Sequence, residues 1–202
     1  MLADSFHSTL DAIAPPMKTA KPRTPEEAAA IRAEWLAEAK AITDKLAPVG
    51  RISLQEMAGC SGLEFLSRIF KGDLPAIPIG ETLGMVPIVA ERGRIVFQGV
   101  PEARFYNPIG SIHGGFLATM LDSAVGCAVH TVLEQGMGYT TLELKVNYLR
   151  ALTEDVGPVR AEGRVVHTSR QIGLAEGSVV DSAGRLYAHA TTTCLIFPLP
   201  TG

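Results

Sequence analysis

The feature that most constrains this chain is one long apolar helical segment, predicted over residues 112–134, with strand patterns on both sides. Before it, residues 85–90 and 94–100 flank a Glu-Arg-Gly turn, which is typical of a β-hairpin. After it come further alternating runs joined by short turns. A single helix among antiparallel strands packs most simply across one face of their sheet, so the sequence predicts an α+β fold. The runs after the helix cover residues 142–148, 159–168, 172–180 and 185–197.

The N-terminal part has a different texture. Residues before about Thr24 are rich in proline and read as an arm without core contacts. Thr24 and Glu27 have the spacing of a capping box, which predicts a helix that runs to about Leu46 and stops before a proline. A second helix is predicted from Ser61 to Gly72. We therefore divide the chain into an N-terminal arm and helical extension (1–59) and a main domain (60–202).

Composition excludes several classes of function. The 202 residues fit one domain, and the 18 basic and 21 acidic residues are interspersed, so no basic patch indicates a nucleic-acid or membrane-surface partner. No apolar stretch approaches the ~20 residues of a membrane span. The first residues lack the pattern of a signal peptide, and Cys60, Cys127 and Cys194 have neither disulfide nor metal-site spacing. We expect a cytoplasmic protein without a metal.

The start of the long helix combines Gly114 with Gly115. The first N–H groups of a helix have no partner within the helix, and the dipole is positive at that end. Glycine also lets a ligand approach the backbone closely. The pair is therefore suited to holding a developing oxyanion, although many helices begin near glycine.

Asp122 lies in the middle of this apolar helix. An unpaired carboxylate buried there would reduce the free energy of unfolding by roughly several kcal/mol, or would take up a proton. A catalytic role and a structural role, with the carboxylate bonded to a strand or to a partner's helix end, both explain it. His113 fits a helix cap as well as a site, and Asn107 fits an ordinary turn.

Together these residues form a pattern. Asn-Pro-x-Gly-x-x-His-Gly-Gly from Asn107, followed by Asp122 nine residues after the histidine, resembles the PaaI-type (phenylacetic acid degradation) branch of the hotdog thioesterases. The likeness continues through residues 141–150, 161–167 and 181–186 and covers about 61–197. It leaves residues 1–59 without an explanation.

The resemblance implies a hotdog fold, in which an antiparallel sheet wraps around one central helix, and hydrolysis of an acyl-CoA thioester. Asp122 would be the general base or the nucleophile, and the Gly114 N–H would polarise the carbonyl. Asn107 would orient water or substrate, Thr141 would place a hydroxyl near the acid, and His113 would position the others.

The resemblance also implies residues that contact the substrate. Gly115, Thr119 and Ser123 would line the substrate path along the helix. The resemblance implies no cofactor apart from the CoA of the substrate, and it implies sites shared between two subunits of a homodimer, which can double to a tetramer. Cationic residues near strand ends are candidates for the CoA nucleotide, with ordinary solvated charges as the alternative: Arg150, Arg164, His167 and Arg170.

Two other functions stay open at this point. A hotdog hydratase or dehydratase would need an Asp–His pair, and the second histidine of the helix, His130, lies about 12 Å from Asp122 along the axis. A non-catalytic acyl-CoA or aromatic-ligand binding module could use the same pocket, with the N-terminal helix as its partner-binding element. The acyl group is also open between aromatic and aliphatic, because the candidate lining residues could equally be core: Phe105, Tyr106, Phe116, Met120 and Met137.

Overall fold

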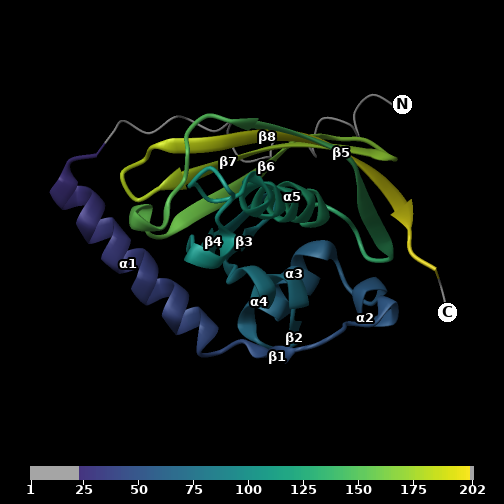
Figure 1. Cartoon of the computed structure of the whole chain (residues 1–202). Helices are drawn as coiled ribbons and strands as arrows, with labels where there is room; N and C mark the ends of the chain where they lie inside the picture. The colour runs from purple at the N-terminus through teal and green to yellow at the C-terminus, as the bar shows by residue number, and fades with distance from the viewer. Residues whose placement is uncertain (1–22, 201–202) are drawn as a thin grey trace.

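The computed structural model describes residues 23–200 and shows a six-stranded antiparallel sheet curved over one central helix (Figure 1). The strand order is β3-β4-β6-β7-β8-β5, so β3 and β5 are the two edges. The predicted hotdog fold with an N-terminal helical extension is confirmed. The elements of the sheet and its helix are β3 (Val86–Glu91), β4 (Arg94–Gly99), α5 (Gly114–His130), β5 (Met137–Tyr148), β6 (Val159–Thr168), β7 (Ile172–Asp181) and β8 (Leu186–Pro198).

The central helix α5 lies against the concave face of the sheet, with the long strands β5 to β8 across it (Figure 1). Two glycines let it approach closely. A Cβ on Gly163 of β6 would lie 2.2 Å from the carbonyl oxygen of Ala124, and one on Gly177 of β7 would lie 2.7 Å from a methyl of Val125. At these two positions, the helix packs closely against the backbone of the sheet. The helix is also shorter than predicted, because residues 112–113 and 131–134 lie outside it. Its most deeply buried side chains are Met120, Leu121, Ala124, Val125, Ala128 and Val129.

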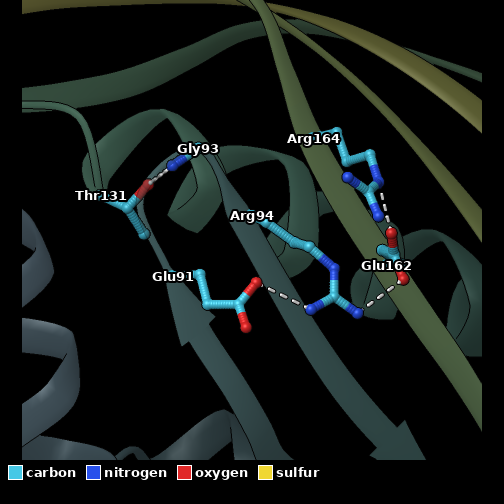
Figure 2. A network of polar contacts seen from close by, with 6 residues as sticks. All are labelled: Glu91, Gly93, Arg94, Thr131, Glu162 and Arg164. Carbon is cyan, nitrogen blue, oxygen red and sulfur yellow. Dashed lines mark hydrogen bonds and ion pairs between the residues drawn. The ribbon is translucent and has the colours of Figure 1, made fainter. Parts of the chain in front are cut away.

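The end of α5 is fixed to the β3–β4 hairpin. The C-cap residue Thr131 accepts a hydrogen bond from the Gly93 N–H at 2.7 Å (Figure 2). It donates one to the Ala128 carbonyl at 2.6 Å, and all three residues are buried. Gly93 has φ +75°, the left-handed conformation that the hairpin turn requires. On the outer face, Arg94 pairs with Glu91 and Glu162.

The edge strand β5 contains a β-bulge at Leu142. Thr141 pairs with Cys194 and Glu143 with the adjacent Thr193, so Leu142 has no partner on β8. A bulge shifts the alternation of side chains. The period of two predicted for residues 142–148 is therefore wrong at Leu142, which is 57% exposed, and holds from Leu144 onward, where Leu144 and Val146 are partly buried. The inward side chains of β5 are Tyr139 and Thr141 before the bulge, then Leu144, Val146 and Tyr148 after it.

The N-terminal extension covers two further surfaces (Figure 1). Helix α1 (Pro25–Thr43) packs near the β3–β4 side, where the Arg160 guanidinium lies 4.4 Å from the ring centre of Trp35 and the Gln98 amide donates to the Trp35 carbonyl. The chain then passes under α5, on the side away from the sheet. This layer consists of β1 (Ala47–Val49), α2 (Leu54–Ala58), α3 (Gly62–Lys71), β2 (Pro75–Ala76) and α4 (Pro78–Leu83).

The predicted helix starts of the extension are confirmed. Thr24 and Glu27 form a complete capping box, and Ser61 caps α3, which ends at Gly72 in the left-handed conformation. Helix α1 ends at Thr43, three residues before the predicted Leu46. The short elements β1, α2, β2 and α4 were not predicted. The layer under α5 also runs past residue 59. The division of the chain between residues 59 and 60 stays a prediction, and the predicted arm before Thr24 lies almost wholly outside the described residues.

None of the helices within residues 23–200 is long and apolar enough to cross a membrane.

Candidate active site

The loop before α5 is organised by Asn107. Its Oδ1 accepts hydrogen bonds from the N–H groups of Ile109 (3.0 Å) and Ser111 (3.2 Å), and its Nδ2 donates to Ser111 Oγ (2.9 Å). Gly110, with φ +86°, completes the turn. The side chain of Asn107 is thus engaged in its own loop, which is the turn role that the sequence left open. Its predicted role in orienting water or substrate stays a prediction.

His113 is the N-cap of α5. Its Nδ1 accepts a hydrogen bond from the Gly115 N–H (2.9 Å), and its own N–H donates to the Phe105 carbonyl (2.7 Å). The Gly114 N–H, by contrast, has no hydrogen-bond acceptor among residues 23–200. The Gly114 N–H therefore remains free at the positive end of α5, and His113 caps the helix beside it.

Tyr148 lies against this helix start. Its hydroxyl donates to the Gly114 carbonyl (3.2 Å), and a Cβ on Gly114 would lie 3.0 Å from the Tyr148 ring. Glycine is therefore needed at 114 for the close approach of an aromatic ring. Tyr148 was missed as a site residue, because its place in an alternating strand indicated only a core-facing side chain.

Asp122 and Thr141 meet across α5 and β5. The Thr141 hydroxyl donates to Asp122 Oδ1 at 3.0 Å, so the structure brings together the predicted acid and the predicted hydroxyl. The expectation that Asp122 is buried is wrong for the single chain, because its side chain is exposed. The reason is the open seam between the edge strand β5 and the layer under α5. Nothing in the described part of the chain covers the carboxylate there.

Two thiols lie near this carboxylate. Burial raises the pKa of Cys127 to about 11, and the negative charge of Asp122 adds to the effect, although a hydrogen bond from the Tyr139 hydroxyl opposes it. Burial also raises the pKa of Cys194. Both thiols therefore stay protonated at neutral pH and are poor nucleophiles.

The two halves of the candidate site lie far apart within one chain. Gly114 and Asp122 are eight residues apart on α5, which is about 12 Å along the helix axis. One thioester carbonyl cannot contact both. The free N–H and the carboxylate can act on the same bond only if they come from different chains.

The predicted substrate-path residues form one row on α5. Gly115, Thr119 and Ser123 follow one another at intervals of four residues, which places them on the same side of the helix. The Thr119 hydroxyl donates to the Gly115 carbonyl (2.9 Å), so it is occupied within the helix. Ser123 lines a cavity together with Cys127.

The predicted CoA-binding cations are not brought together. Arg150 follows the C-terminal end of β5, whereas His167 and Arg170 lie at the β6–β7 turn, beyond the other end of that strand. The strand separates them by roughly 25 Å. All three side chains are exposed. Arg164 pairs with Glu162 on the outer face of the sheet (Figure 2), and its part in CoA binding stays a prediction.

The aromatic and methionine candidates divide between core and surface. Phe116 and Met120 are buried in the core, and Phe116 stacks on Phe105 with 5.1 Å between ring centres. They hold the helix in place and leave little room for an acyl group. Tyr106 and Met137 are partly buried. Tyr106 packs against the core around Phe116 and Met120, and Met137 packs against the core around Val129.

The arrangement of potential metal ligands is also informative. Within residues 23–200, no group of three or more His, Cys, Asp or Glu side chains could hold an ion. The expectation that the reaction needs no cofactor stays a prediction.

Comparison with known proteins places this geometry in a family. Residues 109–188 match the thioesterase superfamily. The proofreading thioesterase EntH of Klebsiella pneumoniae is 30% identical over 103 residues, which are 51% of this chain and 74% of EntH. A phenylacetic acid degradation-related protein from Ralstonia eutropha superposes with a TM-score of 0.59 and 31% identity over 64% of this chain and 97% of the other.

The PaaI protein of E. coli has a TM-score of 0.56 at 22% identity, over 61% of this chain and 87% of its own, and it supports the fold alone. These likenesses confirm the PaaI-type resemblance that the Asn107–Asp122 pattern indicated. The chain belongs to the thioesterase superfamily and is a thioester hydrolase with the hotdog fold.

Proposed function

We propose that the protein hydrolyses an acyl-CoA thioester to the free acid and CoA, with Asp122 as the catalytic carboxylate. The observation that carries this proposal is the Asp122–Thr141 pair: an exposed carboxylate with one oxygen fixed by a hydroxyl at 3.0 Å. The other oxygen has no partner in the described part of the chain and faces the seam where substrate can enter.

The chemistry fits these parts. The acyl–sulfur bond is already activated, so a carboxylate and an oxyanion donor are sufficient. Either Asp122 takes a proton from the attacking water, or its oxygen attacks the carbonyl and the resulting mixed anhydride is hydrolysed. In both cases the carbonyl oxygen becomes negative and accepts a hydrogen bond from the free Gly114 N–H. The C–S bond then breaks, and the CoA thiolate leaves and takes up a proton.

The second part of the proposal is that each site is shared between two chains of a homodimer. Because Gly114 and Asp122 are about 12 Å apart on one helix, a two-fold arrangement is needed to bring the N–H of one chain to the carboxylate of the other. The surface near β5 supports it. Strand β5 is an unpaired edge with three exposed large apolar side chains on it or directly after it, at Leu142, Tyr148 and Leu149.

The hydratase alternative finds little support in this geometry. His130 is 3% exposed and lies between the rings of Phe65 and Tyr139, with centroid distances of 5.5 Å and 5.3 Å. Burial lowers its pKa to about 4, so it is neutral at physiological pH. A histidine enclosed in this way does not face Asp122 or a substrate.

Wild-type protein with acyl-CoA and a thiol reagent tests the activity. We expect repeated turnover, with many equivalents of thiol released per chain. The binding-module alternative predicts saturable acyl-CoA binding without thiol release, and that result would overturn the proposed reaction.

A complementation experiment tests the shared site. Asp122→Asn and Gly114→Val chains should each be inactive, the latter because a side chain at 114 displaces Tyr148. After mixing and chain exchange, half of the dimers are mixed and each has one intact site, so about a quarter of wild-type activity should return. A site within one chain would give no recovery. Sedimentation of the wild type distinguishes a dimer from the tetramer.

A further inference from the structure

The layer under α5 forms a partly open cavity of about 410 Å³ against the central helix and the β3–β4 hairpin. The walls opposite the central helix come from the end of α1, the short strands β1 and β2, and helices α3 and α4. Residues before 109 lie outside the matched family region, and about a third of this chain has no counterpart in the Ralstonia structure, which covers 64% of it. The family resemblance begins near residue 61, so the part of the wall formed by residues 43–49 lies outside it.

One wall of the cavity is the central helix itself. Ser123 and Cys127, one turn apart on α5, line it from above. Ser123 directly follows Asp122, so the carboxylate and the cavity wall are neighbours on the helix. Tyr139 of β5 contacts Cys127, which places this wall at the edge of the open seam. A substrate held at Asp122 therefore has the cavity within reach across Ser123.

The interior is apolar. Among residues 23–200, no lysine, arginine or histidine lines it, and Glu81, exposed on α4, is the one charged lining residue. The Thr43 hydroxyl donates to the Ala39 carbonyl (2.8 Å) and offers no unpaired group. The Cys127 thiol is neutral. The main apolar lining is Leu46, Val49, Leu66, Ile69, Phe70 and Phe97.

We propose that this cavity binds the acyl chain of the substrate and selects straight aliphatic chains of medium length. The proposal rests on the proposed function, because the thioester must sit at Asp122 for its chain to enter past Ser123. A water molecule occupies roughly 30 Å³ in the liquid, and a methylene group is similar in size, so the volume corresponds to about 14 such groups at most, and to roughly ten when a chain fills it imperfectly. Acyl groups of about eight to twelve carbons fill it, and an acetyl group does not reach it.

The alternative occupants are less well supported. An aromatic ring would fill only part of the volume, and Phe70 and Phe97 already meet edge to face at 5.8 Å. A partner protein could use the exposed rim at Val49, Ile77 and Ile79, which are 39–44% exposed. That reading does not explain why the inner wall borders the catalytic seam.

The experiment measures kcat/KM for a series of straight-chain acyl-CoAs from acetyl to palmitoyl, with phenylacetyl-CoA alongside. For wild type, kcat/KM should rise by about twofold to fourfold for each methylene that enters the cavity, then level off near ten to twelve carbons. Ala76→Phe fills the cavity from β2. It should lower kcat/KM for decanoyl-CoA at least tenfold and leave butyryl-CoA unchanged within twofold, which also shows that the variant is folded.

Two further variants complete the test. Ala58→Phe places the same ring in α2, in the same layer but away from the cavity lining, and should not change the chain-length profile. Val49→Asp puts a charge at the half-exposed rim without requiring space, and should again reduce activity toward long chains alone.

The outcomes are distinct. If wild type hydrolyses no acyl-CoA of any length, the proposed function has failed. If wild type is active but its profile is flat, or Ala76→Phe and Ala58→Phe behave alike on decanoyl-CoA, the cavity does not hold the acyl chain, although the thioesterase activity stands. A preference for phenylacetyl-CoA that Ala76→Phe leaves intact would contradict the aliphatic assignment.

Discussion

Replacing Thr131 by valine should destabilise the junction between α5 and the β3–β4 hairpin while preserving its shape. The Thr131 hydroxyl is the only hydrogen-bond acceptor recorded for the Gly93 N–H in the described structure, and both residues are buried. Valine fills the same volume without an acceptor. Its cost is therefore the desolvation penalty of an unpaired N–H, with little packing change.

The expected magnitude follows from the two bonds. The hydroxyl accepts a hydrogen bond at 2.7 Å from the Gly93 N–H (Figure 2). It donates one at 2.6 Å to the Ala128 carbonyl. An unpaired buried donor costs about 1–3 kcal/mol, so we expect the free energy of unfolding to fall by about 2 kcal/mol. For a chain of this size, that lowers the melting temperature by roughly 4–8 °C.

Urea unfolding followed by circular dichroism, at fixed protein concentration, measures the change. Thr131→Ser retains the hydroxyl and should recover most of the loss. Thr191→Val changes an exposed threonine of β8 in the same way and should be neutral within about 0.5 kcal/mol. Equal stability of Thr131→Val and wild type would refute the reasoning, because the hydroxyl would then not hold the hairpin.

Three more predictions address pH, catalysis and packing. Because burial lowers the pKa of His130 to about 4 against 6.5 when unfolded, the free energy of unfolding should fall by roughly 2–3 kcal/mol as the pH is lowered from 7.5 to 4.5; urea unfolding of His130→Gln should lack that part of the slope. Thr141→Val should lower kcat about tenfold with KM nearly unchanged, whereas Thr141→Ser should stay close to wild type; a pure KM effect would mean that the hydroxyl binds substrate instead of holding Asp122. Gly163→Ala puts a Cβ 2.2 Å from the Ala124 carbonyl and should destabilise by about 2 kcal/mol or more in urea, whereas Gly59→Ala, with 3.3 Å to its nearest neighbour and an ordinary backbone, should be tolerated.

The strongest sequence patterns predicted most of the fold. The capping residues Thr24 and Ser61 mark the starts of α1 and α3, because a hydroxyl accepting a helix N–H is a local interaction that short spacing reveals. Strand β6 starts directly after Gly157-Pro158 and β7 ends at the turn of residues 181–184, so glycine, proline and polar residues mark both limits in the sequence. Helix α2 was missed although Ser53 and Glu56 form a complete capping box. The short elements β1, β2 and α4 are held by tertiary packing under α5, and no local periodicity marks them.

The site was predicted in its parts but not in its arrangement. The pairing of Thr141 with Asp122 came from the resemblance alone, since the bulge at Leu142 that orients β5 leaves no clear sign in the sequence. The exposure of Asp122 was missed because an apolar helix suggests burial on all sides. Periodicity cannot show that one side of the helix stays exposed in the single chain.

The role of Asp122 is tested most directly by thiol release from decanoyl-CoA by wild type and Asp122→Asn, under single-turnover conditions. The amide keeps the size of the carboxylate and can still accept from the Thr141 hydroxyl, but it cannot take a proton from water or attack the carbonyl. Asp155→Asn, at an exposed position in the short 3₁₀ turn before β6, is the matched control and should match wild type. We predict that Asp122→Asn loses at least a hundredfold in rate, which corresponds to about 2.7 kcal/mol of transition-state stabilisation, while still binding CoA. A folded Asp122→Asn protein that releases thiol within a few-fold of the wild-type rate would contradict the account, and the catalytic group would have to be another.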